Sequence, residues 1–521
     1  MIRTTNTTAK SGIWAGLLLI AASCTHSTVT TPSTANTEAF ASQERPNIIL
    51  FYVDDLGFGD LSSYGAKRVS TPNVDKLVKN GLKFTDGHSP AATCTPSRYS
   101  LLTGEYAFRN RAAILPGDAP LLIDTSKLTL PKVLRKAGYT SAVVGKWHLG
   151  LGNGNVDWNQ SVAPGPLETG FDYSFLLPAT GDRVPTVYLE NHKVVNLGGG
   201  APLKVSYEKN LGQERATREN ARYLSDKQHS RTLVNGVGRI GAMIGGEEAY
   251  WTDEDFPFVF TEKAVSFMEQ NKRNPFFLFF SFHDIHVPRL PNEQFKNTTD
   301  MGPRGDAIVQ MDWMTGRIMD KLEELGLAEN TLVIFTSDNG PVLNDGYADF
   351  AEEMLGDHMP SGPYRGGKYS AYEAGTRVPT ITHWPGVVQP GVSDALVSQV
   401  DILASVASLI QVPLNENEAI DSENLLGAFL GNASTGREYL LEESHTFSLR
   451  KNHWKYIQPI PRDNKAPSWM EKKGIETGFH SEPQLYNLEM DVHETVNVVQ
   501  DYPDLVTEME EQLNQLLQSE I

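Results

Sequence analysis

The chain has 521 residues, more than one ordinary domain, so its length favours two domains. Its composition, with 40% hydrophobic and 9% aromatic residues, is typical of a globular protein. The net charge of −19 argues against a nucleic-acid partner, because phosphate binding needs a basic face.

The first 44 residues have the pattern of an export signal and a tether. Arg3 and Lys10 precede an apolar run over 13–22, which is too short to span a bilayer. Residues 21–24 are similar to a bacterial lipobox that ends at Cys24. We therefore expect a signal over 1–24, a lipid anchor at Cys24 and a flexible tether over 25–44, rich in Ser, Thr and Ala.

This reading predicts a protein of the periplasm or cell surface that touches a membrane only through its anchor. The alternative is cleavage and secretion, with Cys24 lost or incidental. In both cases the folded body keeps Cys94 as its only cysteine, so its stability depends on the hydrophobic core rather than on disulfides.

Four apolar runs rich in β-forming residues each end in a polar cluster. Such runs predict strands buried on both faces, and they alternate with helical stretches such as 128–137 and 306–325. The pattern predicts an α/β fold, a large and mostly parallel sheet with helices on both faces. Ligands bind at the carboxyl ends of strands in such sheets, so the four ends predict one shared site. The predicted strands are 47–53, 139–144, 275–282 and 331–337.

Two of these strand ends offer oxygen ligands. Asp54 and Asp55 follow the first strand, and Asp338 and Asn339 follow the fourth. Taken singly, each pair is more typical of a turn or a helix cap. Together they offer hard ligands that suit Ca²⁺ or Mg²⁺, while no cysteine or histidine pair has the spacing of a zinc site. Their convergence favours a divalent metal site.

The segment from Cys94 to Gly104 is the main candidate for the reacting centre. Cys94 has no obvious disulfide partner, because the only other cysteine is Cys24. We predict a polar turn over 94–98 and a helix from Ser100, whose N-terminal amides face that turn and suit an anion. The alternative is a buried cysteine that acts as a small hydrophobe.

Cys-Thr-Pro-Ser-Arg at 94–98, followed by Leu-Leu-Thr-Gly at 101–104, resembles the signature of the type I sulfatases of the alkaline phosphatase superfamily. The resemblance implies that a maturation enzyme oxidises Cys94 to formylglycine. One hydroxyl of the hydrated aldehyde can attack the sulfur of a sulfate ester and release the alcohol. The other then loses its proton and expels inorganic sulfate, which regenerates the aldehyde.

The resemblance also assigns the metal ligands. Asp54, Asp55, Asp338 and Asn339 match the Ca²⁺ ligands of the family position by position, and Cys94, as formylglycine, is the fifth group at the metal. The metal would polarise the sulfate and hold the formylglycine hydroxyl in line for attack.

Two lysines match further family motifs, Lys146 at 145–150 and Lys368 at 366–368, and Arg98 lies in the first motif. By position, Arg98 would stabilise the formylglycine and the metal shell. Lys146 and Lys368 would bind sulfate oxygens and offset charge that grows in the transition state. An isolated lysine is more often a solvated surface group, but each of these lies inside a longer match.

Two histidines are candidates for proton transfer. By resemblance, His148 would accept the proton that triggers sulfate elimination, and His286 would protonate the leaving alcohol. The family often has proline where Ile285 stands, so His283 is an alternative to His286.

The segment 168–256 shows no clear sheet pattern, and a charged stretch over 207–231 predicts a helix. Insertions of this kind often line a substrate cleft. Arg183 and His229 are candidates for sugar binding, and surface salt bridges are the alternative for each.

After residue 400 the pattern changes. A helix is predicted over 401–410, and short strands over 438–441, 447–450, 454–458 and 484–488 precede a final helix over 505–517. We expect a catalytic domain over 45–400 and a smaller C-terminal subdomain over 401–521, an antiparallel sheet with a packed helix. His445 is a further candidate for substrate binding from this part.

The expected function is hydrolysis of sulfate esters, on a sulfated glycan outside the cytoplasm. Such a substrate is anionic, so the local cations must override the negative charge of the whole chain. One alternative is a phosphodiesterase or phosphonate monoester hydrolase of the same superfamily. The other is a non-catalytic glycan-binding lipoprotein, which would not need nucleophile, metal ligands and cations together.

Overall fold

Five parallel strands form the centre of a ten-stranded sheet in the computed structural model, which describes residues 45–461 and 466–519. Their side chains are almost all buried, as continuous apolar runs require. Shorter strands extend both edges, so the sheet is mixed and mostly parallel, which confirms the predicted fold class. The central strands are, in spatial order, β13 (Thr331–Ser337), β1 (Asn47–Val53), β12 (Phe276–Ser281), β4 (Thr140–Lys146) and β5 (Tyr173–Leu177). The edge strands are β14 (Thr380–His383), β2 (Leu82–Phe84) and β15 (Gly391–Ser393) beside β13, and β6 (Leu189–Glu190) and β7 (Lys193–Val194) beside β5.

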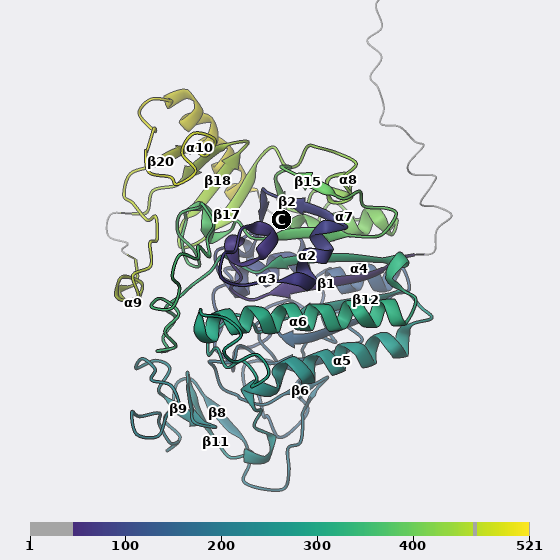
Figure 1. Cartoon of the computed structure of the whole chain (residues 1–521), viewed down its shortest axis with the longest axis vertical. Coiled ribbons are helices and arrows are strands. Elements are labelled where there is room, and N and C mark those ends of the chain that lie inside the picture. The colour runs from purple at the N-terminus through teal and green to yellow at the C-terminus, as the bar shows by residue number, and fades with distance from the viewer. Residues whose placement is uncertain (1–44, 462–465, 520–521) are drawn as a thin grey trace, which may run out of the picture. The chain divides into compact units, whose positions relative to one another are not determined.

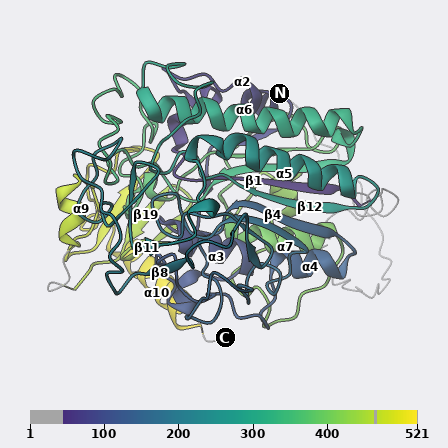
Figure 2. The same cartoon turned by 90° about the horizontal axis from the view of Figure 1, so that it is seen from below.

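Helices cover both faces of this sheet (Figures 1 and 2). Ile49, Phe51 and Val53 alternate along β1 and pack into one core with residues of the α5 and α6 layer, such as Phe260 and Met311. None of the helices in the described ranges combines the length and apolarity needed to cross a bilayer. One layer contains α2 (Pro72–Lys79), α5 (Phe256–Asn271) and α6 (Gly302–Glu324), and the other contains α3 (Cys94–Thr103), α4 (Leu130–Lys136) and α7 (Ile402–Leu409).

A smaller antiparallel sheet of four strands follows near the C-terminus, as predicted, and packs against helix α10. Leu449 and Tyr456 of this sheet share a core with Met509 and Leu513 of α10. The predicted helix at 401–410 corresponds to α7, whose contacts include α3 and α4 of the larger layer. The elements of this part are α8 (Leu426–Phe429), β17 (Leu440–Glu443), β18 (Phe447–Lys451), β19 (Trp454–Ile457), α9 (Ser468–Lys472), β20 (Gln484–Asn487) and α10 (Pro503–Gln518).

The segment 168–256 differs from the prediction in two ways. It contributes β5 to the large sheet and forms two short antiparallel pairs, β8 (Lys204–Ser206) with β11 (Ala242–Ile244) and β9 (Thr232–Val234) with β10 (Val237–Arg239). The helix predicted over 207–231 is absent from the described chain. The polar side chains there bond to nearby backbone instead, as when Asn220 Oδ1 accepts from Thr217 N at 2.7 Å.

The predicted signal over 1–24 with its anchor at Cys24, and the tether over 25–44, lie outside the described residues.

Candidate active site

The register of the central strands brings four chain segments to one edge of the sheet. Val53 pairs with Ser337, Tyr52 with Ser281, and Ser281 with Gly145, so β1, β13, β12 and β4 end at nearly the same level. Gly145 has a φ of 110°, and a Cβ there would lie 1.8 Å from the carbonyl oxygen of Ser281, so only glycine fits at this position. The polar residues that follow the four strands therefore converge.

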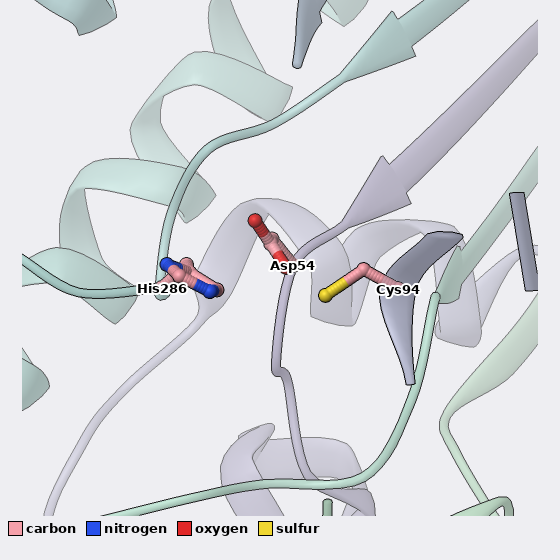
Figure 3. Close-up of side chains that lie close together, drawn as sticks. All are labelled: Asp54, Cys94 and His286. Carbon is pink, nitrogen blue, oxygen red and sulfur yellow. The ribbon is translucent and has the colours of Figure 1, made fainter. Parts of the chain in front are cut away.

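Helix α3 begins at Cys94 itself, so the turn predicted over 94–98 and the helix start at Ser100 were wrong. The N–H groups of the first helical turn have no partner within the helix, and Pro96 therefore costs no hydrogen bond there. Cys94 stands at the N-terminus of α3 and is 1% exposed. The carboxylate of Asp54 and the ring of His286 lie next to its sulfur (Figure 3).

Three buried carboxylates and three buried cations surround Cys94 in equal number. Arg98 bonds Asp338 through both Nε and Nη2 and also donates from Nη1 to Ser281 Oγ at 2.6 Å. The three ion pairs are Asp54 with Lys146 (2.6 Å), Asp338 with Arg98 (2.8 Å) and Asp55 with Lys368 (2.9 Å). With all six groups ionised the charges cancel, so this cluster alone has no net charge to attract an anion.

Two buried oxygens in the cluster have no hydrogen-bond partner among the described residues, Asp54 Oδ1 and Asn339 Oδ1. Asn339 Nδ2 donates to Asp55 Oδ1 at 2.8 Å, which fixes the orientation of the amide and of its free oxygen. Ligand atoms of Asp54, Asp55, Cys94 and Asp338 all lie within 4.8 Å of one another. Unpartnered buried oxygens are costly, and the carboxylate and amide oxygens of this cluster are hard donors that fit a divalent cation such as Ca²⁺.

The electrostatics of the cluster oppose thiolate chemistry at Cys94. Burial raises the pKa of the thiol to about 12, although Lys146 and Lys368 act in the opposite direction. The thiol is therefore protonated at neutral pH and is a poor nucleophile. Burial also raises the pKa of Asp54 well above the usual carboxyl range, more than Lys146 lowers it.

His148 is held as a neutral base beside Cys94. Its Nε2 lies 2.9 Å from the carbonyl oxygen of Leu115, which can only accept, so Nε2 carries the proton and Nδ1 keeps a free lone pair. Nδ1 is buried without a partner among the described residues. Burial and the charge of Lys146 hold the pKa of His148 well below its usual value. Its φ of 55° is strained for a non-glycine residue, as is frequent at functional sites.

His286, rather than His283, faces the cavity at Cys94. Its Nδ1 lies 2.7 Å from the carbonyl oxygen of Val287, so Nε2 points to the site, 3.9 Å from Asp55 Oδ2. Burial, with Lys368 and Lys146, lowers the pKa of His286 well below its usual value. The ring of His283 instead packs against Phe256, at 5.3 Å between centroids.

A cavity of about 240 Å³, here called the inner cavity, opens onto Cys94, His148, His286 and Lys368. Arg183 and His229 line it too, so neither is a surface residue. Arg183 Nη1 bonds Asp182 Oδ1 at 2.9 Å, and His229 lies between Asp226 (2.7 Å) and Asp182 (3.3 Å). Burial alone would lower the pKa of His229, but the two carboxylates have the larger effect, so the pKa of His229 lies above its usual value.

His445 lies apart from this cavity. It lines a different one, with Phe447, Pro459 and Phe479, and its ring packs against Phe479. His445 precedes β18 of the small sheet. The C-terminal part of the chain contributes Trp469 of α9 and Lys473, just after α9, to the inner cavity instead.

Several lining residues of the inner cavity were not among the predicted site residues. They are Ile114, Asp182, Gln228, Ile240, Asp345, Tyr369, Trp469 and Lys473. Asp182 and Tyr369 adjoin predicted residues and could have been included on that ground. Trp469 and Lys473 follow no motif, and only the packing of the C-terminal segment brings them to the cavity.

Comparison with known proteins identifies the class. Residues 46–412 match the sulfatase family, so the chain belongs to this family and is a sulfuric ester hydrolase. It is 47% identical over 479 residues to the N-acetylgalactosamine-6-O-sulfatase of Bacteroides thetaiotaomicron, which covers 91% of this chain and 93% of that protein. It is 30% identical over 490 residues to human arylsulfatase A, which covers 90% of this chain and 87% of that protein.

A solved structure of a Bacteroides thetaiotaomicron sulfatase, from the metabolism of multiple glycosaminoglycans, superposes with a TM-score of 0.88 at 46% identity. The match covers 91% of this chain and 99% of that one, so the large sheet and the small C-terminal sheet are both shared. The predicted family and fold are thus confirmed.

Proposed function

We propose that the enzyme hydrolyses the 6-O-sulfate of an N-acetylgalactosamine-type sugar in a glycan, with formylglycine formed from Cys94 as nucleophile and a Ca²⁺ ion. The observation that carries the proposal is the position of Cys94, buried within reach of Asp54, Asp55 and Asp338 and open to the inner cavity. The sugar is taken from the relative named as an N-acetylgalactosamine-6-O-sulfatase.

The thiol pKa of Cys94 supports an altered nucleophile, since a protonated thiol attacks poorly. A formylglycine hydrate supplies two hydroxyls on one carbon, one to attack sulfur and one to expel sulfate by reforming the aldehyde. The N-terminal position on α3 favours the negative charge that builds up there, because the helix dipole is positive at this end.

The two unpartnered oxygens of the cluster support a bound cation. Asp54, Asp55, Asp338 and Asn339 would hold it through the two unpartnered oxygens and the neighbouring carboxylates. A bound divalent ion supplies Lewis acidity toward the sulfate and toward the hydroxyl at position 94. With such an ion the cluster would be net positive, which would attract a sulfate monoanion in a protein of net charge −19.

The cations and histidines have complementary tasks in this proposal. Lys146 and Lys368 bind sulfate oxygens. Arg98 holds Asp338 in place and stabilises the formylglycine at position 94. Nδ1 of His148 takes the proton whose loss leads to sulfate release, since its lone pair is free. His286 protonates the leaving alcohol. The nearby negative charge of the bound sulfate ester raises the low pKa of its ring, and the ring can then carry the proton.

The remaining proposals concern substrate and location. Arg183 and His229 bind the sugar, with Asp182 orienting both, whereas His445 contributes nothing at the inner cavity. We also propose export with a lipid anchor at Cys24, maturation by a formylglycine-generating enzyme and a catalytic domain over 45–400 followed by the subdomain 401–521.

The mass of the tryptic peptide 84–98, from protein made in its own cells, tests the nucleophile. Replacement of H₂S by O at Cys94 is the expected result, and an intact thiol in active enzyme would overturn it. Sulfate and phosphate monoesters of the same 6-hydroxyl are then compared by kcat/KM. We expect the sulfate ester to be the better substrate, and a preference for phosphate would favour the phosphonate or phosphodiester hydrolase alternative.

A further inference from the structure

A second cavity, here called the outer groove, adjoins the inner cavity. It measures about 490 Å³, and its walls come from 224–226, 343–353 and helix α9 with its C-terminal end. Trp469 and Lys473 line both cavities, so the two spaces meet at these side chains. None of the residues given a role in the proposed function lines the outer groove.

The size of the inner cavity limits what it can hold. Its volume of about 240 Å³ is below the roughly 300–1,000 Å³ of sites for drug-sized ligands, which leaves room for about one sulfated sugar. The rest of a glycan must leave this space. The outer groove is the adjoining space, and it begins at a tryptophan.

The outer groove has the surface of a sugar site. Phe350 and Leu224 line it with 57% and 42% of their surface exposed, and Trp469 is only partly buried. Phe350 has a φ of 62°, a strained conformation. Exposed apolar side chains gathered in one groove mark ligand sites, and the C–H faces of a sugar ring stack on aromatic rings.

The charges of the groove select against anions. Three of its charged side chains are held in ion pairs: Asp349 with Arg289 (2.7 Å), Asp226 with His229 (2.7 Å) and Lys473 with Asp345 (2.8 Å). The other charged side chains of the groove are Glu352, Glu353 and Lys472. All three are exposed, and none forms an ion pair within the described chain. Two carboxylates against one ammonium disfavour a second anionic sugar by like-charge repulsion.

We propose that the outer groove is a second sugar subsite, which binds an uncharged sugar residue linked to the sulfated sugar in the inner cavity. The inference rests on the proposed function, because it takes a sulfated glycan as the substrate. Trp469 provides the shared wall, Phe350 and Leu224 the apolar surface, and Glu352 with Glu353 the discrimination against uronic acids.

Three substrates test the subsite with the full-length enzyme. They are 6-O-sulfated N-acetylgalactosamine, the same sugar linked to an uncharged hexose, and the same sugar linked to a hexuronate. Sulfate release gives kcat/KM for each. We expect the hexose-linked substrate to exceed the monosaccharide by about tenfold, and the hexuronate-linked one to fall about tenfold below the hexose-linked one.

Variants of the outer groove test the residues. In Phe350→Ala the ratio of hexose-linked to monosaccharide kcat/KM falls about fivefold, and in Trp469→Ala it falls toward one. The double variant Glu352→Lys/Glu353→Lys raises the relative kcat/KM of the hexuronate-linked substrate about tenfold. Met490→Ala and Glu510→Lys/Glu511→Lys are the matched controls, since these exposed residues line neither cavity, and both keep the wild-type ratios.

The outcomes separate the subsite from the proposed function. Equal kcat/KM for the three substrates, a preference for the hexuronate, or wild-type ratios in both Phe350→Ala and Trp469→Ala would each overturn the subsite alone. If none of the three substrates releases sulfate, the proposed function fails and the subsite fails with it.

Discussion

Two buried ionic clusters in this protein have similar composition and different architecture. The active-site cluster contains Asp54, Asp55, Asp338, Arg98, Lys146 and Lys368. The junction cluster, between the large and the small sheet, contains Asp86, His88, Glu373, Glu442, Arg450 and Lys455. Both contain acidic groups close enough together to hold a metal, so proximity alone does not distinguish them.

The distribution of hydrogen bonds does distinguish them. In the junction cluster, both carboxylate oxygens of Glu373 and of Glu442 have partners, for example Lys455 at 3.1 and 2.8 Å. Asp86 and Glu442 outweigh the effect of burial on His88 and raise its pKa. Its Nε2 lies 2.8 Å from Asp86 Oδ1 and its Nδ1 2.8 Å from Glu442 Oε1, so both ring nitrogens face carboxylate oxygens. In the active-site cluster, Asp54 Oδ1 and Asn339 Oδ1 remain without partners among the described residues. Arg450 Nε of the junction cluster also lacks a partner among the described residues, but it is a donor and cannot ligate a cation. A cluster with saturated carboxylates joins the two sheets, and free oxygens beside a cavity can bind a cation.

Removal of divalent metal is the test with the largest expected effect on this contrast. Chelation should lower kcat/KM for sulfate release by about a thousandfold or more, because Lewis-acid stabilisation of the transition state is lost. Added Ca²⁺ should restore activity and raise the melting temperature, by mass action on the folded state. Activity and melting curves are measured with chelator and then with a Ca²⁺ titration.

Matched variants assign this response to one cluster. Asp54→Asn should weaken the Ca²⁺ dependence of the melting temperature, whereas Asp86→Asn should keep it. Full activity in chelator, or loss of the Ca²⁺ response in Asp86→Asn alone, would contradict the assignment.

Removing one charge from the junction cluster should lower the free energy of unfolding. Glu442→Gln leaves Lys455 and His88 with less compensation in a buried site, so the free energy of unfolding should fall by about 3–5 kcal/mol. Denaturant unfolding monitored by circular dichroism measures the loss. Glu510→Gln on the exposed face of α10 is the control, with a change within about 0.5 kcal/mol. A change in the Ca²⁺ affinity of Glu442→Gln would show that the two clusters are coupled.

The contrast also explains what the sequence could predict. Four of the five central strands were predictable because continuous apolar runs fix their burial, and the parallel order then brings Asp54, Asp338 and His286 together. The start of α3 at Cys94 was missed, because a polar Thr-Pro-Ser segment suits a turn and a first helical turn equally.

Other features depend on contacts between distant segments. Trp469 and Lys473 reach the inner cavity through the packing of α9, which no local pattern records. The stretch 207–231 was predicted as a helix from its charges, but its Asn and Asp side chains bond to the nearby backbone instead. Whether a carboxylate is saturated, like Glu442, or not, like Asp54, is likewise a property of the fold.

The smallest expected effect concerns Glu443, which follows Glu442 on β17. Its Oε1 accepts from Phe108 N at 3.1 Å, but among the described residues it has no ion pair, and burial raises its pKa from 4.5 to about 8. At a pH between 4.5 and about 8, the Glu443 carboxyl has released its proton in the unfolded chain but keeps it in the folded protein. The contribution of Glu443 to the free energy of unfolding therefore falls as the pH rises through this range.

Glu443→Gln should flatten this dependence, because the amide cannot ionise. Denaturant unfolding of wild type and variant at several pH values between about 5 and 8 measures the slope. Glu510→Gln, on the exposed face of α10, is the control. That variant should keep both the stability and the slope of the wild type. An unchanged slope in Glu443→Gln would mean that Glu443 is ionised in the folded protein. The lack of an ion pair at Glu443 would then not distinguish its protonation state from that of the paired Glu442.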